Sequence, residues 1–144
     1  MTDSMHPFAP VLRTQADVEQ AWRTLVSPLG WDERRLWFML VGADGVPLPI
    51  MSEVGPFPDL VDDEAASDAA WLWRTLLDEF EPDGRVALLL CRPGAGGATG
   101  DDRAMAATLY DACRARGVPT EVLHLATDVT FHPLPADEVM SRSA

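Results

Sequence analysis

The spacing of apolar residues along this chain predicts three helices. After Thr14, apolar residues recur three and four positions apart as far as Pro28, as they do on one face of a helix. The same spacing predicts a helix that is capped by Asp62 or Asp63 and reaches Phe80, and another over 101–116. The buried side of the middle helix is expected to comprise Ala69, Leu72, Trp73, Leu76 and Phe80.

Apolar runs between these helices predict strands over 34–41, 46–54, 85–91, 121–126 and 129–134. The first and third are apolar on both faces, which is typical of central strands. Ala43-Asp44-Gly45 indicates a hairpin, and Pro47 and Pro49 place the start of the second strand at an edge or a bulge. We therefore expect a single α/β (α+β) domain, in which about three helices flank a mixed sheet. The expected order is helix-strand-strand-helix-strand-helix-strand-strand.

The length of 144 residues fits one domain, and no internal repeat is visible. A domain near this size buries roughly 70% of its unfolded surface, so it needs no disulfide or metal to fold. We expect residues 14–140 to form this domain. A flexible arm is expected over 1–13, and a flexible tail over 141–144.

The chain is strongly acidic, with 23 acidic residues, 11 basic residues and a net charge of −12. Such a field repels phosphate, so we expect neither nucleic acid nor an anionic membrane as a partner. No apolar run approaches the ~20 residues that span a bilayer, and the N-terminus does not resemble a signal peptide. We expect a cytoplasmic protein. All basic residues are arginine, which indicates a GC-rich bacterial genome and excludes lysine chemistry.

Residue types that bind metals are few and scattered. Cys91 and Cys113 form no C-x-x-C pair and are expected to be free thiols in a reducing compartment. The histidines, at His6, His124 and His132, are not clustered. We therefore predict no metal and no cofactor.

A glycine-rich loop over 94–100 joins the third strand to the last long helix. A small anion or a nucleotide would be held there by Arg92, Gly94, Gly96, Thr99 and Asp102. However, the loop lacks the third glycine of the dinucleotide-binding fingerprint. Two aspartates in the first helical turn would also repel an anion. A simple connector is the alternative interpretation.

One pattern suggests an enzyme. Cys91 as nucleophile and His124 as its base, with Asp102 nearby, would make a divergent hydrolase if the strand ends and the helix start converge. The competing interpretation is that Cys91 is a small buried apolar residue, as free cysteines usually are. No G-x-S-x-G motif indicates a serine hydrolase.

Trp71 falls almost opposite the predicted buried side of its helix, among Arg74, Thr75 and Asp78. Exposed tryptophans are enriched among the residues that dominate the binding energy of protein interfaces. Trp71 is therefore a candidate contact with a protein partner or with a second copy in a homodimer. The alternative is that the N-terminal arm or the first helix covers it.

The segment from Val86 to Leu134 resembles the JAB/MPN fold, especially its bacterial RadC-like branch. That family carries a strand, H-x-H-P-x-G, and a loop that ends in S-x-x-D at a helix start. The matching residues here are Leu90-Cys91-Arg92-Pro93-Gly94, then Thr99-Gly100-Asp101-Asp102. His124 lies near a histidine of the RadC-like branch, and Glu53 near the upstream glutamate of the family. With the preceding hairpin and helix, the resemblance covers about 36–134.

In active members of that family, two histidines and the aspartate bind zinc, and the glutamate activates the zinc-bound water. Leu90 and Arg92 stand at the histidine positions, so only Asp102 remains, and one carboxylate cannot hold zinc in a tetrahedral site. The resemblance therefore implies a pseudoenzyme without stoichiometric zinc. Degenerate members are typically scaffold or partner-binding domains, and we expect a non-catalytic protein-interaction domain here. The alternatives are the divergent hydrolase, with Glu53 as a further candidate, and the anion binder.

Overall fold

A computed structural model describes residues 11–26, 31, 34–54 and 63–141. The helices among them are α1 (Gln15–Val26), α2 (Asp63–Phe80), α3 (Gly100–Ala115) and α4 (Ala136–Ser141). The strands are β1 (Arg35–Val41), β2 (Pro47–Val54), β3 (Arg85–Cys91), β4 (Leu123–Ala126) and β5 (Phe131–Leu134). The predicted order is confirmed as far as β5, and α4 is an addition that the sequence pattern did not predict.

The strands form one mixed sheet in the order β2-β1-β3-β4-β5. β1 pairs antiparallel with both β2 and β3, β3 pairs parallel with β4, and β4 pairs antiparallel with β5. β2 lies at an edge, and its register against β1 shifts between Met39 and Val41. The position predicted from Pro47 and Pro49 is therefore confirmed, because an edge strand tolerates residues that cannot donate a ladder hydrogen bond.

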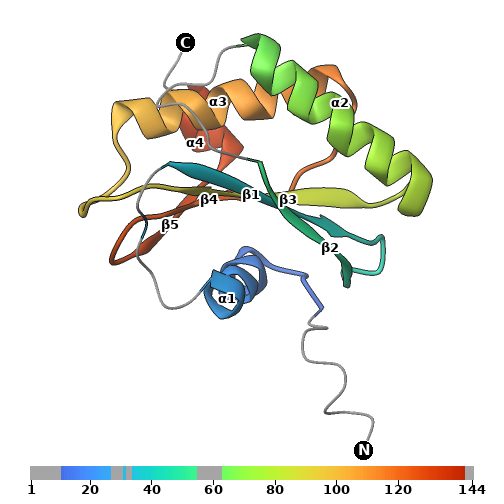
Figure 1. Cartoon of the computed structure of the whole chain (residues 1–144), viewed down its shortest axis with the longest axis horizontal. Coiled ribbons are helices and arrows are strands. Elements are labelled where there is room, and N and C mark those ends of the chain that lie inside the picture. The colour runs from blue at the N-terminus through green and yellow to red at the C-terminus, as the bar shows by residue number, and fades with distance from the viewer. Residues whose placement is uncertain (1–10, 27–30, 32–33, 55–62, 142–144) are drawn as a thin grey trace, which may run out of the picture.

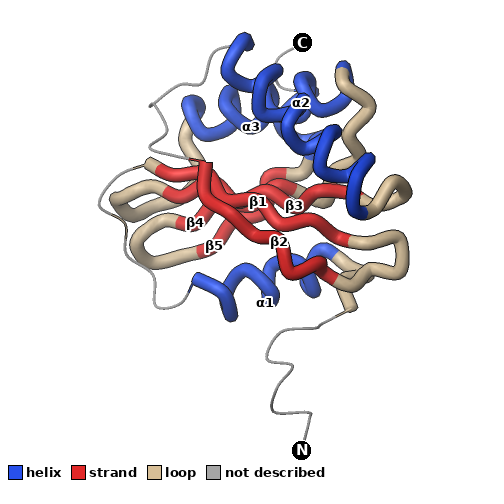
Figure 2. The backbone as a smooth tube through the Cα atoms, turned by 45° about the vertical axis from the view of Figure 1, so that its right-hand side comes forward, coloured by secondary structure: helices blue, strands red, loops and turns tan. Residues whose placement is uncertain are grey.

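Helices cover both faces of this sheet (Figures 1 and 2). α2, α3 and α4 lie on one face, where Leu88 and Leu90 of β3 join the larger apolar cluster. α1 lies alone on the other face, where Leu89 and Cys91 pack in a second cluster with Trp22. Successive β3 residues thus point into different layers, as the pleat requires. This alternation decides which candidate site residues can meet.

Reciprocal side-chain caps fix where α1 and α3 begin. The Thr14 hydroxyl accepts a hydrogen bond from the Asp17 N–H at 3.1 Å, and the Asp17 carboxylate accepts one from the Thr14 N–H at 3.1 Å. Thr99 and Asp102 make the same exchange at the start of α3. After α3, Gly117 adopts a φ of +68°, which favours glycine. The helix predicted over 101–116 is thus confirmed to within one residue at each end.

The prediction of the buried side of α2 is partly wrong. The buried residues of this helix are Ala66, Ala69, Ala70, Trp73 and Leu77. Leu72 and Phe80 were expected inside, but they are 37% and 52% exposed. The helix is rotated so that its alanines face the sheet and Trp73 fills the remaining space. Phe80 is the last residue of the helix, where burial against the sheet is incomplete.

The boundary expected at residue 13 also differs from the structure. Leu12 is 1% exposed, and its N–H donates to the Gly45 carbonyl at 2.7 Å. Arg85 donates to the Leu12 carbonyl at 3.1 Å. The chain is therefore attached to the β1–β2 turn just before α1. The rest of the predicted arm, residues 1–10, and residues 142–144 of the tail lie outside the described residues.

Candidate functional site

A buried ion pair lies where the loop after β3 meets the start of α3. The Asp102 side chain is fully buried, and that of Arg92 is 11% exposed. Arg92 Nε donates to both carboxylate oxygens of Asp102 at 3.0 Å, and Arg92 Nη2 lies 2.9 Å from Oδ2. The guanidinium thus contacts the carboxylate through two of its nitrogens, which is the strongest geometry for this pair.

Asp102 has further partners that hold it ionised. Its Oδ2 accepts the Thr99 N–H at 2.9 Å, and its Oδ1 accepts from Arg34 Nη1 at 3.3 Å. Burial opposes ionisation, but the hydrogen bonds from Arg92 and the Thr99 N–H, with the positive charge of Arg92, outweigh it. The pKa of Asp102 is therefore lowered below its ordinary value. The carboxylate is occupied by protein donors on each side.

Arg92 was expected to bind a ligand together with the glycine-rich loop. In the structure it donates hydrogen bonds to this loop itself. Its Nη1 donates to the Pro93 carbonyl and its Nη2 to the Gly97 carbonyl, both at 3.1 Å. Arg103 Nη1 donates to the Ala98 carbonyl at 3.1 Å. The loop therefore turns carbonyl oxygens toward the arginines. An anion site needs N–H donors that are not already used. The donors of Arg92 are instead bound to carbonyl and carboxylate oxygens of the protein, so this loop is poorly suited to hold an anion.

The start of the glycine-rich loop is fastened from the β4–β5 turn. Gly94 N–H donates to Asp128 Oδ2 at 2.8 Å, and the Asp128 N–H donates to the Gly94 carbonyl at 3.0 Å. Asp128 Oδ1 accepts the Trp31 N–H at 2.9 Å. These hydrogen bonds from the N–H groups of Gly94 and Trp31 lower the pKa of the Asp128 carboxyl. Gly94 and Gly96 have φ values of +101° and +88°, so glycine is needed there for the turn itself.

The structure does not bring the hydrolase candidates together. His124 pairs in register with Leu89, and its Nε2 lies 3.9 Å from Glu19 Oε1 of α1. Asp102 lies on the α3 side of the sheet, so the sheet stands between these two side chains. Cys91 shares the α1 side with His124 but pairs in register with Ala126.

The surroundings of His124 indicate a buried neutral imidazole. Its Nδ1 donates to the Val122 carbonyl at 3.0 Å, and its Nε2 is buried without a hydrogen-bond partner among the described residues. Burial lowers the pKa of His124 below its ordinary value, outweighing the hydrogen bond to Val122 and the charge of Glu19. Nδ1 is thus committed to the Val122 carbonyl, and Nε2 makes no hydrogen bond to the Cys91 thiol. Cys91 and His124 are fully buried, so no substrate reaches them from solvent.

Other candidate residues have simpler positions. Glu53 belongs to β2 and pairs in register with Trp37, and its side chain lies outside the described residues. Cys91 and Cys113 are free thiols, as predicted, and burial raises the pKa of Cys113 to about 12. Among the described residues, no group of three or more His, Cys, Asp or Glu side chains could hold a metal ion.

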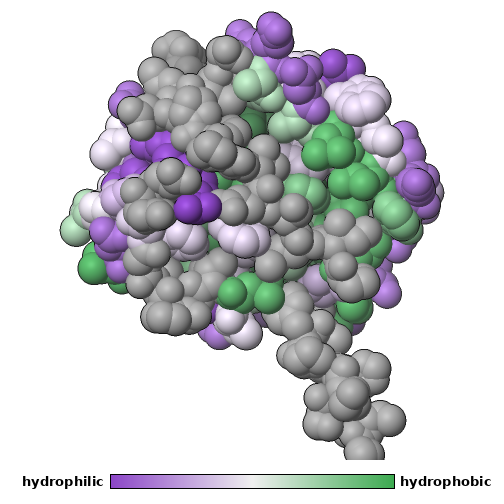
Figure 3. All heavy atoms as spheres, in the orientation of Figure 1, coloured by the Kyte–Doolittle hydropathy of each residue, from purple (hydrophilic) through white to green (hydrophobic). Residues whose placement is uncertain are grey.

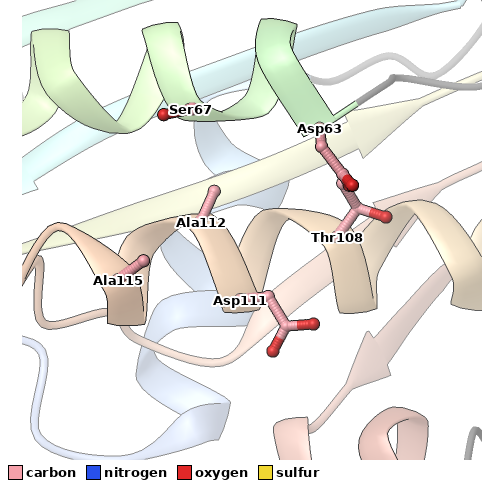
Figure 4. A pocket seen from close by; sticks show the side chains of 6 residues that line it. All are labelled: Asp63, Ser67, Thr108, Asp111, Ala112 and Ala115. Atoms are coloured by element: carbon pink, nitrogen blue, oxygen red, sulfur yellow. The ribbon is translucent and has the colours of Figure 1, made fainter.

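A shallow hollow of about 280 Å³ opens between α2 and α3 (Figure 4). It is lined by Asp63, Ser67, Thr108, Asp111, Ala112 and Ala115. Figure 4 shows the Asp111 side chain pointing away from α2. Ser67 accepts hydrogen bonds from Arg116 Nε and Nη2, at 3.3 and 2.9 Å. Ser67 is thus engaged by Arg116, and Asp63 and Thr108 are the remaining polar side chains that Figure 4 shows close together in the hollow.

The most prominent surface feature is the outer side of α2. Trp71 is 56% exposed, which confirms that it faces solvent. Leu72 and Phe80 of the same helix are also exposed, but Phe80 lies nine residues from Trp71 and therefore on nearly the opposite side of the helix. Figure 3 shows apolar residues gathered on the side of the molecule below α2. No described helix has the length and apolar character required to cross a bilayer.

Comparison with protein-family models, curated proteins and solved structures finds no match to this chain. The relationship to the JAB/MPN fold therefore stays a prediction from the residues that carry it.

Two residues of the ion-pair site were not expected from the sequence. Arg34 reaches Asp102 from just before β1, and Asp128 fastens the loop from the β4–β5 turn. Both contacts join positions far apart in the chain, and neither has a spacing that a motif describes. The one available signal was Thr127-Asp128 between two short predicted strands, since an aspartate in a turn commonly accepts backbone N–H groups.

Proposed function

We propose that this chain is a non-catalytic protein-interaction or scaffold domain, and that it binds its partner through the outer side of α2. The observation that carries this proposal is the exposure of Trp71, Leu72 and Phe80 on one helix. A soluble domain gains about 25 cal/mol for each Å² of apolar surface that it removes from water. Three large apolar side chains left in solvent along one helix therefore favour covering by another protein.

The interior of the predicted catalytic centre supports a role without catalysis. The resemblance places the two zinc-binding histidines of JAB/MPN proteins at positions 90 and 92. In this chain, Leu90 is packed in the apolar core and Arg92 is paired with Asp102. A guanidinium thus occupies the side of the carboxylate where the resemblance would place a cation. A fixed positive charge at that point repels a metal ion. In this proposed role, the Arg92–Asp102 pair is a structural replacement for a metal.

The proposal is tested by comparing the proteins retained by three immobilised forms of the chain in an extract of the source cells. The forms are wild type, Trp71→Ala and Val129→Ala. Val129 is 61% exposed on the β4–β5 turn, so its variant removes exposed apolar surface away from α2. Sedimentation of each form alone detects self-association.

Trp71→Ala is expected to weaken partner or self-association at least about tenfold, as the loss of a dominant interface tryptophan does. Val129→Ala should leave it unchanged. Circular dichroism should show the same fold for all three forms, because Trp71 lies outside the core. Equal association of the three forms would contradict the proposed contact.

A further inference from the structure

The side of the sheet that α1 covers holds a titratable side chain within an apolar layer. α1 lies alone on this face, whereas α2, α3 and α4 share the other (Figure 1). Trp37, Leu89 and His124 pair in register on three adjacent strands, so they form one row across the sheet. Trp22 of α1 is buried with Leu89 in the second apolar cluster. The fully buried imidazole of His124 therefore lies in the layer between the sheet and a single helix.

One nitrogen of this imidazole has no group to bind. The Val122 carbonyl accepts and cannot donate, so its hydrogen bond at 3.0 Å places the proton of the neutral ring on Nδ1. Nε2 then carries a lone pair, and it is buried without a hydrogen-bond partner among the described residues. The carboxylate oxygen Oε1 of Glu19, 3.9 Å away, is also an acceptor. Only a further proton on Nε2 gives the ring a second donor.

The charged groups around His124 do not hold such a proton in the buried ring. α1 presents Glu19 and Arg23, which are bound to each other, with Arg23 Nε 3.1 Å from Glu19 Oε2. The charge of Glu19 favours protonation of His124, while that of Arg23 opposes it. On this side of the sheet β3 presents the thiol of Cys91, and β5 presents a proline in register with His124. Burial is the largest influence, and it opposes the charged form.

α1 is attached to the sheet in a different way from the other helices. It packs through apolar side chains, while Gln20 and Thr24 form their hydrogen bond within the helix. On the opposite face, Tyr110 binds both β4 and β5. The apolar cluster under α1 is also separate from the larger cluster that contains α2 and α3 residues. Detaching α1 therefore leaves the larger cluster intact, as expected of a unit that opens locally.

We propose that α1 is a pH-operated cover: when His124 takes up a proton from solvent at Nε2, α1 leaves the sheet, and the layer of α2, α3 and α4 stays folded. Water then reaches the imidazolium, because His124 faces α1 and not the other helices. The face that is uncovered is apolar and includes Met39, Leu89 and Phe131. This device goes beyond the proposed function, since it controls the exposure of one side of the sheet without involving α2.

Two buried cysteines report separately on the two layers. Cys91 belongs to the cluster under α1, and Cys113 belongs to the larger cluster on the other face. The full chain is treated with a dipyridyl disulfide, a thiol reagent that stays reactive in mild acid, between about pH 7.5 and 5, where histidine ordinarily titrates. Peptide mass spectrometry gives the initial rate at each thiol. Each rate is divided by that of an unstructured cysteine peptide at the same pH.

Cys91 is expected to react at least about tenfold faster than Cys113 at pH 5, because detaching α1 costs less free energy than opening the larger cluster. Acidification from pH 7.5 to 5 should accelerate Cys91 about tenfold. An ordinary histidine pKa of 6.5 limits this rise to ~30-fold. His124→Phe should abolish the rise. Glu19→Gln should enlarge it, because the Glu19 charge favours protonation while α1 is docked.

His132→Gln is the matched control. His132 lies on β5 and pairs in register with Leu125, whose side chain belongs to the larger cluster on the other face. This variant removes a histidine from the neighbouring strand without changing the layer under α1. It should therefore keep the acceleration of Cys91 that the wild type shows.

The inference is overturned if the two thiols react at equal rates that rise together in acid, because the whole domain then opens at once. It is also overturned if the Cys91 rate does not change with pH. A wild-type rise in His124→Phe, or a smaller rise in Glu19→Gln, would show that another group takes up the proton. None of these outcomes involves Trp71, so the proposed function is judged separately.

Discussion

At the scale of single residues, the pairing of Arg92 with Asp102 explains why a charged group is tolerated without exposure to solvent. Asp102 is 0% exposed and receives hydrogen bonds from two arginines and one backbone N–H. Burying a carboxylate without such partners would cost several kcal/mol. The same pair ties the loop after β3 to the first turn of α3. The cluster therefore has a structural role that requires no ligand.

Arg92→Ala is expected to destabilise the protein by about 3 kcal/mol, because it leaves the buried carboxylate with Arg34 as its nearest cation. Chemical denaturation measures this change. Arg114→Ala is the control, since Arg114 is 68% exposed and lies 3.8 Å from Asp111, and it should change stability by less than about 0.5 kcal/mol. Combining Arg92→Ala with Asp102→Asn should recover part of the loss. An Arg92→Ala variant as stable as wild type would contradict a structural role for the pair.

His124 gives the folded state a defined dependence on pH. Its pKa is lowered by burial, so below the ordinary value of 6.5 the unfolded chain takes up a proton that the folded protein resists. The stabilisation that neutral His124 gives to the folded state is therefore full above about pH 6.5. It declines as the pH falls toward the pKa that His124 has in the folded protein.

His124→Phe should flatten this decline, which is measured by denaturation at a series of pH values between about 7.5 and 5. Glu19→Gln should steepen it, because the Glu19 charge raises the pKa of His124 and its removal makes protonation in the folded state harder. Identical pH slopes for wild type and His124→Phe would show that this histidine does not contribute.

At the scale of elements, one hydroxyl group of α3 bridges the strands β4 and β5. Tyr110 Oη accepts the Leu123 N–H at 2.7 Å and donates to the Leu134 carbonyl at 2.7 Å. Burial raises the pKa of Tyr110 to about 12, so the group stays protonated and able to donate. This bridge links the helix to both β4 and β5.

Tyr110→Phe is expected to cost about 2 kcal/mol, because it leaves one buried N–H and one buried carbonyl without their partner. Hydrogen exchange should show the Leu123 amide exchanging faster, while amides in β1 keep their protection. An unchanged exchange rate at Leu123 would mean that the bridge does not protect β4.

The elements also show how far sequence patterns lead. The five strands and the three long helices follow from local apolar spacing, because that spacing reflects which face each element buries. The rotation of α2 was harder to predict, since both leucines and alanines form continuous lines along it. Alanines permit close approach to the sheet, and the structure buries that side. α4 was missed because its six residues are too few to show a period.

At the scale of the whole molecule, the sheet order separates residues that the chain places close together. Cys91 and Arg92 are neighbours, but the pleat sends one toward α1 and the other toward α3. The sequence-based hydrolase needed Cys91, His124 and Asp102 to converge, and convergence depends on strand pairing and direction that no local pattern contains. From the sequence, Arg92 and Asp102 could be named only as two candidate residues of the same site. Their pairing with each other could not be predicted.

The surface and the interior together are the basis of our proposal that this domain acts through contact with another protein. The acidic charge and the absence of lysine follow from the sequence, while the exposure of Leu72 and Phe80 required the orientation of α2. The most direct test places a photoreactive phenylalanine derivative at position 71, and in a second variant at position 129, and irradiates source cells that produce each form. We predict a defined cross-linked protein from position 71 that is absent from position 129. Cross-linking from position 129 alone, or from neither position, would contradict binding through α2.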